Sequence, residues 1–174
     1  MHLKVETFIL DDSYLLQFLR AKKYLMDETF KVFENHFLFR HSHQIWFQMT
    51  EEDAQRLKTF VKTGIGYVLT KRDVTTGSYI AVFNGENFDL DKYSHQDLFH
   101  SLFTSLVNNL ELEDNQILGY SCIINLSNTP AKFFTSLPIV DLIDSLKILD
   151  KCPGRYKKLV VYGLPSIAVS IFVS

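Results

Sequence analysis

The residue types that most often carry catalysis occur in this sequence without the spacing that catalysis needs. His41 and His43 lie two positions apart with no third ligand nearby, which favours a surface pair over a metal site. His95 and His100 share one predicted helix, but no serine or cysteine has the context of an activated nucleophile. The Gly-Ile-Gly at 64–66 lacks the third glycine of a dinucleotide-binding loop.

The acidic residues give no indication of catalysis, and the overall charge gives none of nucleic-acid binding. Glu111, Glu113 and Asp114 follow a predicted helix, and we interpret them as solvated loop residues. A formal net charge of −2 supplies no positive field that would attract nucleic acid. We therefore predict that the protein is not an enzyme and has no catalytic residue, metal site, cofactor or nucleic-acid partner.

Four cations surround one turn near the C-terminal end of the chain. They flank Pro153 and Gly154 and are Lys151, Arg155, Lys157 and Lys158. One interpretation is a solvated loop. The other is a site for anionic lipid head groups, to which clustered Lys and Arg side chains are attracted.

The middle of the chain alternates apolar strands with amphipathic helices. The predicted strands are Tyr79–Asn84, Ile117–Asn125 and Leu159–Tyr162. The helices between them are predicted at Ser94–Leu110 and Lys132–Leu149. This order predicts an α/β fold with a mostly parallel βαβαβ sheet, and right-handed crossovers put both helices on one face. The other face then needs a cover.

Helices are also predicted before the sheet. Asp11 and Asp12, Asp27 and Thr50 are placed to start three of them. In the second helix an aromatic stripe of core residues is expected from Phe30, Phe33 and Phe37. We predict an N-terminal helical lobe at 1–63, followed by the sheet domain at 64–174.

The segment Asp11–Tyr24 (DDSYLLQFLRAKKY) resembles the start of the CRAL-TRIO domain in the group of cellular retinaldehyde-binding and alpha-tocopherol transfer proteins. That group has an Asp-Asp pair followed by Leu-Leu-x-Phe-Leu-Arg-Ala. A weaker similarity in pattern covers nearly the whole chain, at Phe30–Arg40, Lys71–Gly77, Phe88 and Asp89, Tyr120–Leu126, Pro153 and Pro165. The sequence is therefore similar to a CRAL-TRIO lipid-binding domain.

The resemblance implies a lipid carrier with an N-terminal three-helix lobe and a sheet that encloses one hydrophobic lipid, such as a retinoid or tocopherol. Arg155 and Lys157 match two basic residues that contact phosphatidylinositol bisphosphate in the tocopherol-transfer branch. The family domain continues past the equivalent of Ser174, so a C-terminally truncated copy is implied. We expect a cytoplasmic, peripherally membrane-associated protein whose two cysteines are free thiols.

The aromatic content of 14% suits either a core rich in phenylalanine or a cavity lined for an apolar ligand. We predict that the uncovered face of the sheet lines such a cavity, with further walls from the helices. The predicted lining residues are Tyr79, Ala81, Phe83, Phe99, Phe103, Tyr120, Cys122, Ile124, Phe133, Val160 and Tyr162.

An alternative function is a cargo-free fragment that acts as a membrane-associated or partner-binding module. The last residues are nearly all apolar, and their large side chains are Ile167, Val169, Ile171, Phe172 and Val173. Contiguous apolar surface of this kind predicts self-association.

Overall fold

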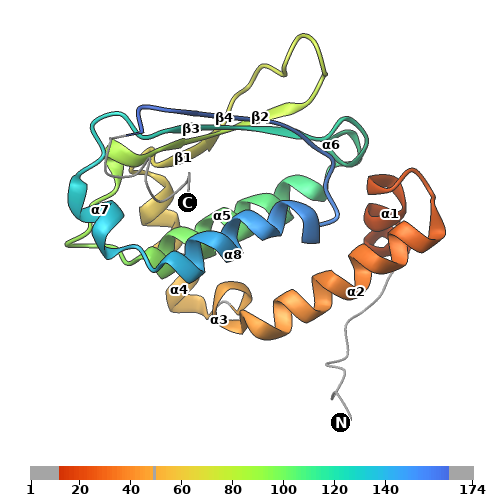
Figure 1. Cartoon of the computed structure of the whole chain (residues 1–174), viewed down its shortest axis with the longest axis horizontal. Helices are drawn as coiled ribbons and strands as arrows, with labels where there is room; N and C mark the ends of the chain where they lie inside the picture. The colour runs from red at the N-terminus through yellow and green to blue at the C-terminus, as the bar shows by residue number, and fades with distance from the viewer. Residues whose placement is uncertain (1–11, 49, 165–174) are drawn as a thin grey trace.

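The computed structural model describes residues 12–48 and 50–164 of the 174-residue chain. The apolar tail for which self-association is predicted lies outside these residues. Helices lie on one side of a four-stranded sheet, and the helices within residues 26–47 lie farthest from the sheet (Figure 1).

The helices that precede the sheet in the chain are α1 (Asp12–Ala21), α2 (Met26–Ser42), α3 (Gln44–Phe47) and α4 (Glu51–Val61). Thr50 and Asp53 start α4 with a capping box, in which each side chain accepts a hydrogen bond from the backbone N–H of the other residue. The aromatic stripe predicted for α2 is wrong at its first position, because Phe30 is 66% exposed. The buried row starts one residue earlier and consists of Thr29, Val32, His36 and Phe39.

The sheet has the strand order β1 (Gly66–Val68), β2 (Tyr79–Asn84), β3 (Tyr120–Asn125) and β4 (Tyr156–Tyr162). The strands β2, β3 and β4 are parallel, whereas β1 pairs with β2 in the antiparallel direction. The predicted α/β class is confirmed. The three residues of β1 were not predicted, because so short a strand has no usable alternation of apolar and polar residues.

The connections between the parallel strands contain α5 (His95–Leu110), α6 (Glu113–Leu118), α7 (Ala131–Ser136) and α8 (Ile139–Lys151). A short 3₁₀ turn, Gly85–Asn87, follows β2. The single helix predicted at Lys132–Leu149 is two helices, because Leu137 has an extended backbone (ψ 120°) in front of Pro138. The acidic segment predicted as a loop contains the helix α6, which takes up residues assigned to the start of the second strand.

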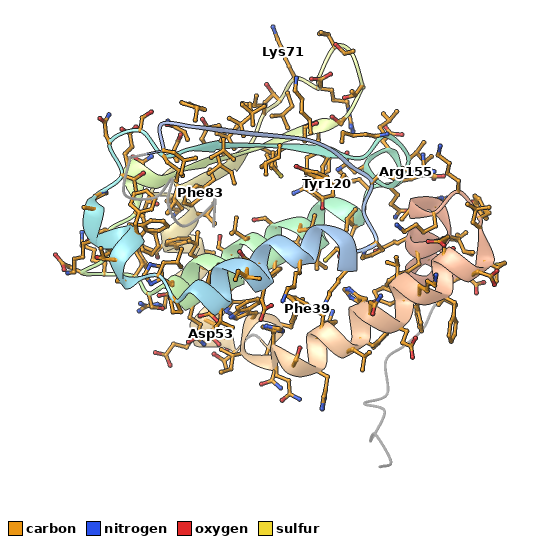
Figure 2. All side chains as sticks on the ribbon, in the orientation of Figure 1. Phe39, Asp53, Lys71, Phe83, Tyr120 and Arg155 are labelled. Carbon is orange, nitrogen blue, oxygen red and sulfur yellow. The ribbon has the colours of Figure 1, made fainter. Side chains whose placement is uncertain are left out.

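The two faces of the sheet have different surroundings. On the face that we call the covered face, the paired residues include Tyr79 with Tyr120, and Phe83 with Ile124. Phe83 and Ile124 pack against the helices, with the Phe83 ring 6.4 Å from that of Phe133 in α7. Figure 2 shows Phe83 and Tyr120 on this side of the sheet. The opposite side, which we call the open face, has none of the helices drawn in Figure 1.

A β-bulge in β4 decides which of its residues belong to each face. Tyr120 pairs with Tyr156, but Ser121 pairs with Lys158, so Lys157 is an extra residue. Without it, Val160 would pair with Ile124 and would lie on the covered face. One extra residue reverses the direction of every later side chain.

The predicted cavity lining is therefore corrected in its placement. Val160 and Tyr162 lie on the open face, opposite Ile123 and Asn125 in register. The lining residues of β2 and β3 lie on the covered face, beneath which the helices pack: Tyr79, Ala81, Phe83, Tyr120, Cys122 and Ile124. The expectation that all eight of these strand residues line the uncovered face is wrong.

The described core has two parts. One cluster lies between the covered face, α4, α5 and α7, and its buried members are Leu57, Phe60, Ile65, Phe88, Leu98, Leu126, Phe133 and Phe134. The other joins α5 to α2 and α3 through Phe39, Trp46, Phe99, Phe103 and Cys152. The centroid of the Trp46 ring lies 4.9 Å from that of Phe99 and 5.1 Å from that of Phe103. These two phenylalanines therefore contact the N-terminal helices.

Candidate functional site

The guanidinium of Arg155 binds backbone carbonyl groups of two helical segments. Its Nε donates a hydrogen bond of 2.8 Å to the carbonyl oxygen of Arg20 at the end of α1, and Nη2 donates to the same oxygen. Its Nη1 donates to the carbonyl oxygen of Ile117 in α6 at 2.7 Å. A charged donor forms strong hydrogen bonds to the exposed carbonyl groups at the end of a helix. Arg155 thus connects α1 and α6 to the start of β4.

The side chain of Lys151 also turns toward the N-terminal helices. Its Nζ lies 5.1 Å from the centre of the Phe39 ring, and its carbonyl oxygen is 2.9 Å from Nδ1 of His36. His36 is 2% exposed, and burial lowers the pKa of its ring to about 4. The ring is therefore neutral at physiological pH, and Nδ1 donates the hydrogen bond to the carbonyl.

The basic turn differs from the expectation that four cations face solvent together. Lys157 and Lys158 are exposed, whereas Lys151 and Arg155 are partly buried against helices α2, α1 and α6. The reason is that the turn is the point where the N-terminal helices dock on the sheet. Sequence reasoning did not identify these tertiary partners, of which His36 and Arg20 lie more than a hundred residues away along the chain.

The candidate lipid site is a strip of small and apolar side chains on the covered face. This apolar strip consists of Ala81, Cys122, Ile124, Leu159 and Val161, which are neighbours by strand register. The residues of β2 and β3 are half-buried, whereas Leu159 and Val161 of β4 are 38% and 37% exposed. The strip therefore offers accessible apolar surface on the side of the sheet that faces the helices.

Aromatic side chains border the apolar strip at both ends. At one end the Tyr79 and Tyr120 rings stack with centroids 5.7 Å apart, and the Tyr156 ring meets Tyr120 edge-on at 5.6 Å. At the other end Phe83 contacts Phe133. These rings give the strip a defined length along the strands.

The titratable groups around the strip are neutral at physiological pH. Burial raises the pKa of the Cys122 thiol to about 11 and that of Cys152 to about 12. Burial also raises the pKa of the phenols of Tyr79 and Tyr120 above the usual value for tyrosine. Protonated thiols and phenols are poor nucleophiles and bases. The arrangement suits the binding of a hydrocarbon, which gains about 25 cal/mol for each Å² of apolar surface removed from water.

Known proteins of similar sequence include the clavesins. The chain is 29% identical to clavesin-1 of Xenopus laevis over 147 residues, which are 84% of this chain and 44% of that protein. It is 28% identical to clavesin-1 of Rattus norvegicus and 29% identical to clavesin-2 of Homo sapiens, again over 84% of this chain, and 41% and 45% of those proteins. The chain is similar to the clavesins over most of its own length. These matches confirm the resemblance to the CRAL-TRIO lipid-binding domain family.

The chain spans less than half the length of these clavesins. No protein-family model matches it. Within the described ranges, 12–48 and 50–164, no helix is both long and apolar enough to cross a membrane.

The structure brings part of the predicted lining together. Seven residues lie on or against the covered face: Tyr79, Ala81, Phe83, Tyr120, Cys122, Ile124 and Phe133. Phe99 and Phe103 face the N-terminal helices, and Val160 and Tyr162 lie on the open face. Leu159 and Val161 were missed. Only knowledge of the bulge at Lys157 would have assigned them to the strip.

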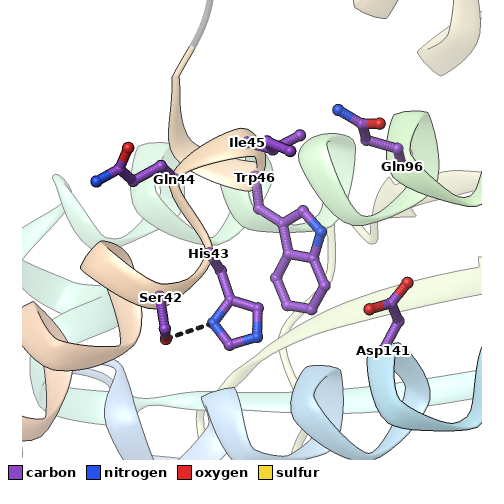
Figure 3. A pocket seen from close by; sticks show the side chains of 7 residues that line it. All are labelled: Ser42, His43, Gln44, Ile45, Trp46, Gln96 and Asp141. Carbon is purple, nitrogen blue, oxygen red and sulfur yellow. Dashed lines mark hydrogen bonds between the residues drawn. The ribbon is translucent and has the colours of Figure 1, made fainter.

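A small pocket of about 270 Å³ lies elsewhere, between the N-terminal helices, α5 and α8 (Figure 3). Besides Ile45 and Trp46 it is lined by polar side chains, among them Ser42, Gln96 and Asp141. Its mixed lining suits a hydrocarbon chain less well than the apolar strip does.

Two of the histidines that were considered as metal ligands or catalytic residues, His43 and His95, have structural contacts. His43 stacks on Phe39 and Trp46 with ring centroids 4.3 Å away, and its Nε2 lies 3.1 Å from Oδ2 of Asp144 in α8. His95 stacks on Phe88 at 5.7 Å. The part of the chain that the structure describes has no group of three His, Cys, Asp or Glu residues suited to a metal ion.

Proposed function

We propose that this chain binds one small hydrophobic lipid, such as a retinoid, a tocopherol or a similar molecule, for transfer between intracellular membranes, without catalysis. The apolar strip is the observation that carries this proposal. It is uncharged, bordered by aromatic rings and partly accessible, and the chain that carries it is similar to the clavesins. The lipid would lie along β3 and β4 on the covered face.

We also propose a cytoplasmic protein that meets phosphoinositide-containing membranes. Lys157 and Lys158 are exposed cations that can reach a phosphoinositide head group. In this proposal Arg155 and Lys151 hold the turn in place against the N-terminal helices. The helical lobe, residues 1–63, then acts as a brace for the sheet domain, residues 64–174.

The test is a titration of delipidated protein with retinol and α-tocopherol, followed by ligand fluorescence. Two neighbouring isoleucines supply a matched pair of variants, because Ile124 lies on the apolar strip and Ile123 lies on the open face. We expect saturable binding of one lipid per chain, weakened about tenfold or more by Ile124→Gln and little changed by Ile123→Gln. Urea unfolding shows whether both variants keep the fold.

Two results would contradict the proposal. One is the absence of saturable binding by the folded chain. The other is an equal loss of binding in the Ile123→Gln and Ile124→Gln variants at equal stability. The first result would favour the alternative function, a cargo-free module that associates with membranes or partners, which the exposed residues of the open face support.

A further inference from the structure

The loop between β1 and β2, residues 69–78, projects from the sheet on the side away from the helices (Figure 1). Val74 lies in the turn of this loop, residues 74–76, which we call the tip, and is fully exposed. A fully exposed valine at the tip of a projecting loop gains nothing from the rest of the fold. Such a residue is available for insertion into an apolar environment outside the molecule.

Hydrogen bonds hold this tip in one conformation. The Asp73 carboxylate oxygen Oδ1 accepts hydrogen bonds from the backbone N–H groups of Thr75 and Thr76 at 2.9 and 2.8 Å. The N–H of Gly77 donates to the carbonyl oxygen of Asp73 at 2.8 Å. These backbone hydrogen bonds lower the pKa of the Asp73 carboxyl group, which therefore stays ionised and bonded. Little conformational entropy remains to be lost when the tip is immobilised.

The base of the loop is fixed to the body of the protein. Arg72 donates a hydrogen bond of 2.8 Å from Nη2 to Oδ1 of Asn115, which is buried in α6. On the open face, the hydroxyl groups of Ser78 and Ser121 lie 2.9 Å apart, and both residues are buried. The loop therefore has a set position relative to β3.

Cations surround the loop on the same side of the molecule. Lys71 is exposed and points away from the sheet (Figure 2). Lys158 pairs with Ser121 on the open face, and its charge contributes to the lowered pKa of Asp73. Tyr67 and Tyr162, which are 45% and 47% exposed, lie on this face by register. Lysines and tyrosines beside an apolar tip are typical of residues at a membrane interface.

We propose that the open face docks on an anionic lipid bilayer, with Val74 inserted among the lipids and Lys71 and Lys158 at the head groups. An anionic surface is chosen because Lys71 and Lys158 are exposed, and the Asp73 carboxylate accepts hydrogen bonds from backbone N–H groups within the loop. The docking surface rests on the proposed membrane contact of Lys158 and deepens it, and it is separate from the proposed cargo site on the other face of the sheet. It requires no bound cargo.

The test is co-sedimentation of the full chain with vesicles of phosphatidylcholine alone and of phosphatidylcholine with 30% phosphatidylserine. We expect stronger binding to the anionic vesicles, with a loss of about tenfold in Val74→Asp. Each lysine near an anionic surface contributes about fivefold, so the double variant Lys71→Ala/Lys158→Ala should lose about 25-fold. The lysine effect should diminish as salt is raised.

Matched control variants lie on the helix side of the sheet. Val140 of α8 is 68% exposed, and Val140→Asp makes the same chemical change away from the loop. Lys31→Ala/Lys92→Ala removes two exposed cations from α2 and the segment before α5. Both controls should bind vesicles like the unchanged chain. A Val74→Trp variant adds a direct readout, because its emission should shift to the blue with anionic vesicles.

Several outcomes would overturn the proposal. One is equal vesicle binding by Val74→Asp and Val140→Asp. Another is equal binding of the chain to neutral and anionic vesicles. A third is the absence of vesicle binding by a folded chain, which would favour a protein partner instead. The retinol titration of Val74→Asp separates the two proposals. If Val74→Asp no longer binds vesicles but still binds retinol, the docking surface is supported. If the chain binds vesicles but not retinol, only the proposed cargo site is contradicted.

Discussion

The two faces of the sheet are built from the same strands but differ in what lies against them. On the covered face Tyr120 is 2% exposed and stacks with Tyr79, whereas on the open face Tyr162 is 47% exposed. The covered face packs against α5 and α7, and the open face has the projecting loop and Lys158. The bulge at Lys157 decides which side chains of β4 lie on each of these two faces.

Substitutions on the two faces should differ most in their effect on stability. Tyr120→Ala removes a buried ring and leaves a cavity, so we expect a loss of about 3 to 5 kcal/mol in the free energy of unfolding. Val160→Ala on the open face, where the side chain is 38% exposed, should cost less than about 1 kcal/mol. Urea unfolding of both variants measures the difference. Similar losses for the two would show that the open face is covered in solution.

The docking of the N-terminal helices under the covered face should depend on pH through His36. Its folded pKa of about 4 lies below the ordinary value of 6.5, so protonation favours the unfolded chain. This stabilising contribution is fully present above about pH 6.5 and is lost as the pH falls toward about 4. At 1.36 kcal/mol per pKa unit the loss amounts to about 3 kcal/mol. Urea unfolding from pH 7.5 to 4 should give a flatter profile for His36→Gln, and identical profiles would contradict this role.

Substitutions in the basic turn test which of its cations stabilise the fold and which are merely exposed. Arg155→Ala removes the donors to the carbonyl oxygens of Arg20 and Ile117, so we expect a loss of about 2 kcal/mol in stability. Lys157→Ala changes an exposed side chain and should alter stability by less than about 0.5 kcal/mol. Thermal unfolding measures both. If Lys157→Ala proved as destabilising as Arg155→Ala, the division of the turn into anchored and exposed cations would be wrong.

Much of the fold could be predicted because local signals agree with the tertiary structure. The apolar runs at Tyr79–Asn84 and Tyr120–Asn125 and the cap at Ser94 locate two strands and α5. The break in the second crossover helix could also have been found, since Pro138 disfavours a helical conformation at Leu137. The helix α6 is stabilised by distant partners instead. Its Gln116 accepts a hydrogen bond from Arg20, 96 residues away.

The candidate site was harder to predict than the fold. Apolar residues of β4 alternate on both faces, and only the pairing of Ser121 with Lys158 shows that Leu159 and Val161 belong with Cys122. Arg155 resembled a head-group ligand because residue type and position along the chain do not show which carbonyls its guanidinium meets. Register and long-range hydrogen bonds are properties of the folded chain.

The division of the sheet into a covered face and a membrane-facing open face is tested most directly by hydrogen–deuterium exchange with anionic vesicles. We expect vesicles to slow exchange of backbone amides in residues 69–78 and in β4, and to leave those of α2 and α8 unchanged. Addition of retinol should not alter the protection of residues 69–78. Protection of α2 or α8 by vesicles, with none in residues 69–78, would contradict the account.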